Sequence, residues 1–271
     1  MRFLLLLPVA VLPFALLGCT GKADDTSNHD SADTDTDTDT DADSDADDTG
    51  PAPTAVLTGS VAAYDGVVAA DIEVQACVTI CFSGRTDSTG VFTFTEMDAG
   101  EYKIDVVGEA VEGKDYGRMR VQAILEDGAT WTTPGAMFMP QMVGPTAVTS
   151  AGSHTFGAVT WTVDPAILTI PFGYDAGLYS VGVVPGADIG AFWSVTPSLA
   201  VAFGPLATAV AGSFDVSVTT DVAAGTYDVY SVDVHGALEG PVGTGTTDGT
   251  TLVATGVTPT VLSWLLFVPQ S

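Results

Sequence analysis

Residues 54–271 consist largely of short runs of β-branched and aromatic residues, and this pattern constrains the fold more than any other feature of the chain. Glycine, proline and aspartate interrupt these runs at intervals of about 8 to 12 residues, and no sustained helical periodicity links them. Such spacing is typical of antiparallel β-sandwiches. We therefore predict an all-β fold with two β-sandwich domains.

The first predicted domain covers residues 54–109, where strand alternation is clearest. Ile72, Val74 and Ala76 are spaced two apart, so their side chains should share one face of a strand. Asp65-Gly66 and the segment 87–90 carry the residues that favour tight turns. Several short strands joined by such turns are expected here.

A charged segment at residues 110–116 is the expected connector, and a second β-sandwich domain should cover residues 117–271. Glycine and proline separate its predicted strands. These strands are expected at residues 118–123, 156–163, 178–184, 214–219, 226–232 and 261–268.

The first domain resembles a known family in its turn and strand motifs. The motifs are Thr86-Asp87 followed by Gly90-Val91-Phe92-Thr93-Phe94, and then Asp98-Ala99-Gly100-Glu101-Tyr102. This order is similar to the carboxypeptidase regulatory-like module, also called transthyretin-like or Cna-B-like. The resemblance implies a β-sandwich that acts as an accessory, stalk or adhesion module.

The second domain resembles ZU5-like sandwich domains in three short pieces, at residues 168–171, 202–205 and 223–227. The first reads Leu-Thr-Ile-Pro and the second ends in Gly-Pro, as in that family. This resemblance implies a β-sandwich fold for the C-terminal part.

The N-terminus has the features of an export signal. A basic Arg2 precedes an apolar stretch that runs to Leu17, and Gly18 then precedes Cys19. Leu16-Leu17-Gly18-Cys19 resembles the bacterial lipobox, which implies cleavage after residue 18 and acylation of Cys19. The alternative is an ordinary signal peptide with a chance cysteine. Thr20, in place of aspartate, implies sorting to the outer membrane by the same resemblance.

Residues 19–53 are expected to form a lipid-anchored, disordered stalk of low complexity. Aspartate alternates with threonine from Asp33 to Asp41, and twelve acidic residues lie between Asp24 and Asp48. Dense like charge with low hydrophobicity favours disorder. Fully extended, such a stalk would reach about 120 Å. Calcium binding is an alternative, but an EF-type loop from Asp33 would need glycine at Thr38.

The charge balance excludes some partners. The chain has 34 acidic and 7 basic residues, for a formal net charge of −27. A surface this acidic repels nucleic acid and anionic head groups. We expect no nucleic-acid partner; divalent cations, basic partners or adaptation to saline surroundings remain open. The basic residues after the stalk are Arg85, Lys103, Lys114, Arg118 and Arg120.

Two further cysteines, Cys77 and Cys81, remain after lipidation of Cys19. An exported protein meets an oxidising compartment, so we predict that they form a disulfide. Residues four apart in a straight strand are about 13 Å distant, so the three residues between them must fold back as a tight loop. Free thiols are the alternative, and zinc binding is not expected.

A catalytic, metal or cofactor site is not expected. Ser153 precedes His154, and Asp164 or Asp233 could complete a triad, but adjacent residues on a strand point to opposite faces. The three histidines lack metal-ligand spacing. We predict a non-enzymatic protein without metal or cofactor.

Exposed aromatic rings could stack on a sugar, so the four tryptophans are candidates for ligand contact. Trp161 and Trp264 lie in apolar or alternating runs and should be buried. Trp131, between two threonines, is the strongest candidate for an exposed stacking residue.

These features together predict a lipoprotein held in the outer membrane through Cys19, facing the periplasm or the cell surface. A structural or interaction role is the first hypothesis. A carbohydrate- or peptide-binding adhesion module, with an extracellular protein or glycan partner, is the alternative.

Overall fold

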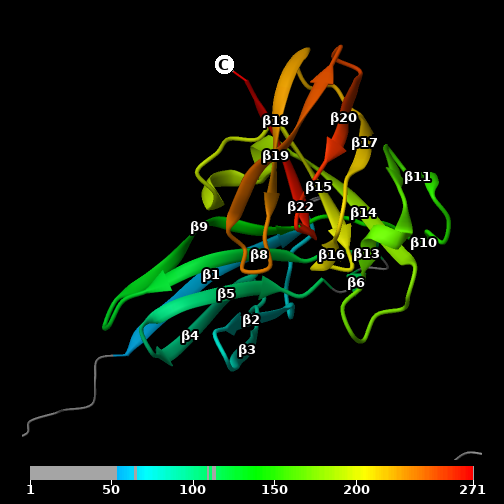
Figure 1. The fold of residues 1–271 in the computed structure, drawn as a ribbon. Helices are drawn as coiled ribbons and strands as arrows, with labels where there is room; N and C mark the ends of the chain where they lie inside the picture. The colour runs from blue at the N-terminus through cyan, green and yellow to red at the C-terminus, as the bar shows by residue number, and fades with distance from the viewer. Residues whose placement is uncertain (1–53, 64–65, 109, 112–113, 271) are drawn as a thin grey trace, which may run out of the picture. The chain divides into compact units, whose positions relative to one another are not determined.

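The structure is a computed structural model that describes residues 54–63, 66–108, 110–111 and 114–270 (Figure 1). The predicted signal, Cys19 and stalk lie outside these residues. The described residues form β-strands and three short 3-10 turns, with no α-helix among them. The all-β prediction is therefore confirmed. Within this part of the chain, no helix has the length and apolar character needed to cross a membrane.

The first sandwich is built from two sheets. One has the strand order β4-β1-β9, in which β1 pairs antiparallel with β4 and parallel with β9. The other has the order β3-β2-β5-β8. The strands are β1 (Ala55–Ala63), β2 (Glu73–Cys77), β3 (Cys81–Arg85), β4 (Val91–Met97), β5 (Gly100–Val106), β8 (Met119–Leu125) and β9 (Thr130–Met139).

Strand alternation accounts for the core of this sandwich. Along β1, alternate side chains are buried, because successive residues of a strand point to opposite faces. Ile72, Val74 and Ala76, predicted to share a face, are all buried in the same core.

The motif Thr86-Asp87 forms the turn that precedes β4. The Thr86 hydroxyl accepts a hydrogen bond from Ile72 N at 2.9 Å and donates to the carbonyl oxygen of Ala69. One Asp87 carboxylate oxygen accepts from the backbone N–H groups of Thr89 and Val91 at 2.8 and 3.0 Å. Hydrogen bonds, the Thr89 hydroxyl first, lower the pKa of Asp87. The turn predicted at residues 87–90 is therefore fixed by side-chain to backbone bonds.

The charged segment at residues 110–116 is not the boundary between the two parts of the fold, as the pairing of the later strands shows. That segment contributes a small hairpin of β6 (Ala110–Val111) and β7 (Lys114–Asp115). The chain then re-enters the first sandwich, because β8 pairs with β5 and β9 with β1. A boundary at 109–117 therefore does not divide the chain into its two parts, because residues 119–139 belong to the first sandwich and the second part is one strongly curved sheet. Charged residues and glycine mark a turn, but they do not tell whether the next strand stays in the same sheet.

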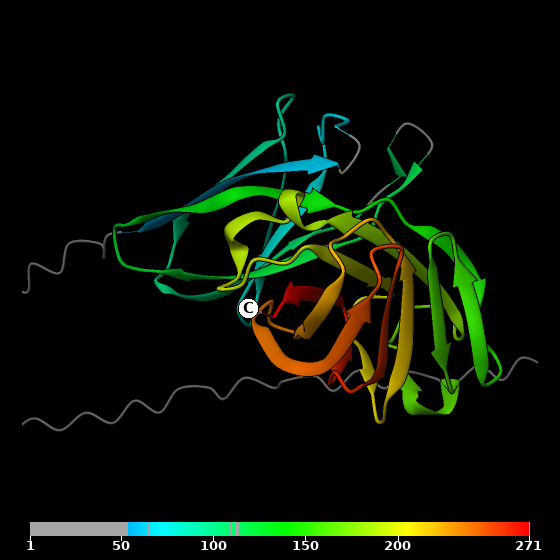
Figure 2. The same cartoon turned by 90° about the horizontal axis from the view of Figure 1, so that it is seen from above.

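The second part contains a sheet of ten strands in the order β10-β14-β15-β22-β18-β19-β20-β17-β12-β11. Seen from above in Figure 2, the sheet curves strongly, and its edge strands β10 and β11 contact each other. Its strands are β10 (Val143–Ala147), β11 (Gly152–Phe156), β12 (Val159–Val163), β14 (Leu178–Pro185), β15 (Leu199–Gly204), β17 (Phe214–Thr219), β18 (Gly225–Val232), β19 (Leu238–Thr247), β20 (Thr251–Val257) and β22 (Trp264–Pro269).

Shorter elements complete this part. A three-stranded sheet has the order β13-β16-β21. The elements are β13 (Leu168–Thr169), β16 (Thr208–Val210) and β21 (Val261–Leu262), with 3-10 turns η1 (Pro165–Ile167), η2 (Gly186–Asp188) and η3 (Gly190–Phe192).

Trp161 is the centre of the core inside the curved sheet. Its ring packs edge-on against Tyr179, Phe203 and Phe214, with centroid distances of 5.2, 5.4 and 5.8 Å. Edge-to-face packing of this kind adds to the stabilisation that burial gives. Trp161 and Trp264 are both buried, as predicted.

A second core continues from the first sandwich into the curved sheet. It joins buried residues of β1 to β9 with Trp193, Ala202, Val232 and Trp264. The first sandwich and the curved sheet therefore pack through a shared apolar layer, and the described residues form one compact unit.

Candidate functional site

The predicted disulfide is present. Cys77 and Cys81 are bonded, and their Cα atoms lie 4.0 Å apart as a cross-strand pair of β2 and β3. The intervening residues fold back as a tight loop, in which Val78 N donates to Ile80 O at 3.2 Å. The geometric condition drawn from the sequence is met.

Trp131 lies on β9 of the first sandwich, beside Leu57 of β1. Its side chain is half-buried and packs against the core that the two parts share. It lines neither of the two cavities described below, so a stacking role for Trp131 stays a prediction.

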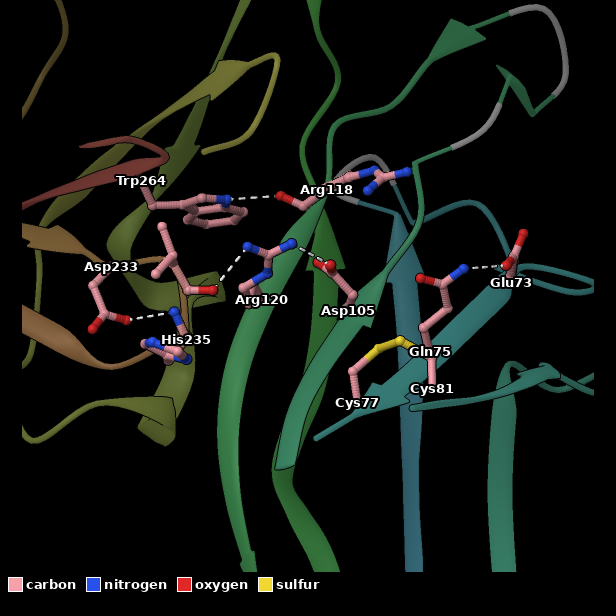
Figure 3. Close-up of polar contacts among 11 residues, drawn as sticks. Glu73, Gln75, Cys77, Cys81, Asp105, Arg118, Arg120, Asp233, His235 and Trp264 are labelled. Atoms are coloured by element: carbon pink, nitrogen blue, oxygen red, sulfur yellow. Dashed lines mark hydrogen bonds and ion pairs between the residues drawn. A yellow bond between two sulfur atoms is a disulfide. The ribbon is translucent and has the colours of Figure 1, made fainter. Parts of the chain in front are cut away.

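The serine and histidine considered for catalysis are engaged elsewhere. The Ser153 hydroxyl lies 2.7 Å from that of Thr162, whereas His154 Nε2 lies 3.0 Å from the carbonyl oxygen of Ser150. Asp233 accepts from the backbone N–H of His235 at 2.8 Å in a turn (Figure 3). The described residues bring no triad together, and they contain no cluster of three or more metal-ligating side chains.

A cleft of about 400 Å³ lies where the segment around the β6–β7 hairpin meets the loop before β14 and the curved sheet. Sequence reasoning missed it, because its walls come from segments distant in the chain. The lining residues are Gly108, Asp115, Tyr116, Gly117, Arg118, Met142, Pro145, Tyr174, Asp175, Leu178, Ser180, Ala202, Phe203, Gly204, Pro205 and Leu206.

The floor of the cleft is apolar and rigid. We define it as the buried lining residues at the end of β15 and in the turn after it, which are Ala202, Phe203, Pro205 and Leu206. Phe203 also packs against Trp161 at 5.4 Å, so the floor is continuous with the core of the curved sheet. Floor side chains held in this way cannot easily rearrange.

One wall comes from the segment that leaves the β6–β7 hairpin. Backbone bonds hold it, because Met142 N donates to Asp115 O at 2.9 Å and Gly117 N donates to Pro140 O at 2.7 Å. A Cβ at Gly117 would lie 2.5 Å from the Met142 sulfur, so a larger residue there would have to displace the Met142 side chain. The Asp115 side chain is exposed at the rim and that of Arg118 is half-buried.

Arg118 is the one basic residue that lines the cleft. Its carbonyl oxygen accepts from Trp264 Nε1 at 2.8 Å (Figure 3). Its guanidinium makes no ion pair with any carboxylate of the described residues. The backbone is thus anchored while the charge remains available to a ligand.

The opposite wall carries an aromatic loop between β13 and β14. Tyr174 and Asp175 line the cleft from this loop, and the Tyr174 side chain is 45% exposed. Phe172, two residues earlier, is fully exposed and does not line the cleft. Gly173 lies between these two aromatic residues, and its φ of +95° is a backbone conformation that favours glycine.

A buried ion pair joins Asp105 to Arg120, which lies close in sequence to Arg118 of the cleft wall. Arg120 Nη2 contacts an Asp105 carboxylate oxygen, and Arg120 Nη1 donates to Val234 O at 2.9 Å (Figure 3). Burial, and then repulsion by Arg120, lowers the pKa of Lys103. Arg120 thereby links the first sandwich to the turn after β18.

A second, smaller cavity of about 310 Å³ lies beside β12 and β17 and carries two carboxylates. Both are already used: Asp164 accepts from Ala166 N at 2.9 Å, and Asp215 accepts from Gly256 N at 2.8 Å. This cavity is the weaker candidate, because its charges are committed to the fold.

Comparisons with known proteins add little. No family model matches the chain, and no curated protein matches it. Among solved structures, the chain is similar to a protein of Bacteroides uniformis described as a "putative carbohydrate binding protein", with 10% identity, a TM-score of 0.26 and 80% of each chain covered. A TM-score this low does not indicate a shared fold.

Proposed function

We propose that this protein is a non-enzymatic binding protein whose ligand occupies the cleft. One side of the cleft is the connector wall, formed by residues 115–118, and the other is the Tyr174 loop. The observation that carries the proposal is the cleft itself: a rigid apolar floor with a few charged and aromatic groups at its rim. Ligand pockets of proteins have this composition, and about 300 to 1,000 Å³ is their usual size.

The second part of the proposal is a lipid anchor at Cys19 in the outer membrane. The support is the sequence Leu16-Leu17-Gly18-Cys19 after an apolar signal, followed by the acidic stalk. Two or three acyl chains would hold the protein stably, at about 0.8 kcal/mol for each buried CH₂ group. The stalk would then present the cleft away from the lipid surface.

The resemblance to carboxypeptidase regulatory-like modules agrees with an accessory or adhesion role. It remains part of the proposal, as does the weaker ZU5-like resemblance of the C-terminal part. A purely structural spacer is the competing role, and it would leave the cleft without a ligand.

An array of immobilised peptides and oligosaccharides, probed with the mature full-length protein, tests the binding role. We expect Tyr174→Ala to weaken binding about tenfold, since a ring that contacts a ligand contributes about 1 to 2 kcal/mol. Phe172→Ala is the matched control, because that ring lies in the same loop outside the cleft. Equal loss in both variants, or no binding by the wild type to any array member, would overturn the proposed function.

A further inference from the structure

We infer that the ligand is a peptide segment in which a basic side chain lies next to an apolar one. This inference rests on the proposed function and adds the class of ligand. It follows from three features of the cleft: the floor, the two carboxylates and the position of Arg118.

The floor favours an apolar side chain. Ala202 and Leu206 are 2% and 7% exposed, and half-buried Leu178 and Met142 extend the apolar surface between them and the rim. A sugar ring seated here would place hydroxyl groups against carbon atoms and lose their hydrogen bonds to water. An aliphatic or aromatic side chain would instead bury apolar surface without loss.

The carboxylates favour a basic neighbour. Asp115 projects from the connector wall and Asp175 from the Tyr174 loop, and both are exposed. Two carboxylates against one guanidinium leave the rim acidic. The whole chain carries a formal net charge of −27, which attracts cationic segments from a distance.

Arg118 makes the cleft complementary to the backbone of a peptide as well as to its side chains. A guanidinium presents donors in a fixed fork, which suits a peptide carbonyl or a carboxylate. The same rim therefore offers acceptors for an ammonium or guanidinium group and donors for the peptide backbone. The exposed Tyr174 ring adds a surface for an aliphatic stem or a cation.

The test uses fluorescent, end-capped tetrapeptides and the mature full-length protein, with binding followed by fluorescence anisotropy. The probes contain lysine-phenylalanine, glutamate-phenylalanine or lysine-serine at their centre, and cellohexaose and chitohexaose serve as sugar probes. We expect the lysine-phenylalanine peptide to bind at least tenfold more tightly than either other peptide.

The double variant Asp115→Asn with Asp175→Asn should weaken that binding about tenfold, because it removes both carboxylates that would pair with the basic side chain of the peptide. Asp164→Asn with Asp215→Asn is the matched control, since these carboxylates belong to the other cavity. Thermal unfolding checks that all variants are folded. Tighter binding of the glutamate peptide, or equal binding by both double variants, would overturn the peptide inference.

The sugar probes separate the two proposals. If a hexasaccharide binds in a Tyr174-dependent manner while no peptide binds, the cleft is a binding site but its ligand is a glycan, and the peptide inference fails alone. If neither class binds here or on the arrays, the proposed function fails as well.

Discussion

The indole nitrogen of Trp264 donates a hydrogen bond to the carbonyl oxygen of Arg118 across 146 positions of sequence, at 2.8 Å. Trp264 begins β22 and is 1% exposed, whereas Arg118 lies on the wall of the cleft. The bond therefore ties the central region of the curved sheet to the segment that positions the guanidinium. Both the stability of the shared core and the shape of the cleft should therefore depend on this hydrogen bond.

We predict that Trp264→Phe destabilises the protein more than Trp161→Phe does. Trp264→Phe leaves the Arg118 carbonyl without its donor, whereas Trp161 Nε1 has no partner among the described residues. The difference should be about 1 to 3 kcal/mol in the free energy of unfolding, measured in urea. Equal losses would show that the bond to Arg118 contributes nothing specific.

The pair Asp105–Arg120 should act as a unit. Both side chains are at least nine-tenths buried, so removing one charge leaves the other without compensation. Arg120→Met alone should cost about 3 to 5 kcal/mol, and Asp105→Leu together with Arg120→Met should cost less than Arg120→Met alone. A double-mutant cycle in urea measures this; additive losses would contradict the prediction.

The contribution of the Asp248 carboxylate to the stability of its turn should disappear at low pH. In the turn between β19 and β20, Asp248 accepts bonds from the Thr250 hydroxyl, Thr250 N and Thr251 N, and these lower its pKa from 3.8 to about 2. The stabilisation is fully present above pH 3.8 and disappears as the pH falls through about 2. The stability difference between the wild type and Asp248→Ala should shrink over that range. A constant difference would show that the carboxylate charge is not involved.

The disulfide should contribute modestly, because the loop that it closes is short. Chain-entropy arguments give about 2 kcal/mol for a loop of this size. Chemical denaturation of the wild type and of Cys77→Ser with Cys81→Ser measures the difference. A loss above about 4 kcal/mol would mean that the bridge does more than restrict the unfolded chain.

The strands were largely predictable, because alternation and turn residues are local signals. Residues 214–219 and the buried Trp161 were found in this way. The assignment of β8 and β9 to the first sandwich was not predictable, since it depends on the pairing of β8 with β5 and on that of β9 with β1, whose paired residues lie about 75 positions apart in the sequence. Pairing partners leave no trace in local periodicity.

The candidate site was predicted only in fragments. Asp115 lies in the charged segment that the sequence predicts to be a connector, whereas Arg118 begins a strand predicted for the second domain. The opposite wall of the cleft, with Tyr174, carried no motif. Cavities of this kind form where distant segments pack, so a single sequence shows their residues without showing their proximity.

Intact-mass analysis of membrane-extracted protein, beside a Cys19→Ser variant, tests the claim of a tethered binding protein most directly. We predict that the wild type begins at residue 19 with the added mass of acyl chains, and that the variant is recovered in the soluble fraction. A wild type that lacks lipid and is released from the membrane would contradict the claim. The cleft would then belong to a secreted protein with an acidic N-terminal segment.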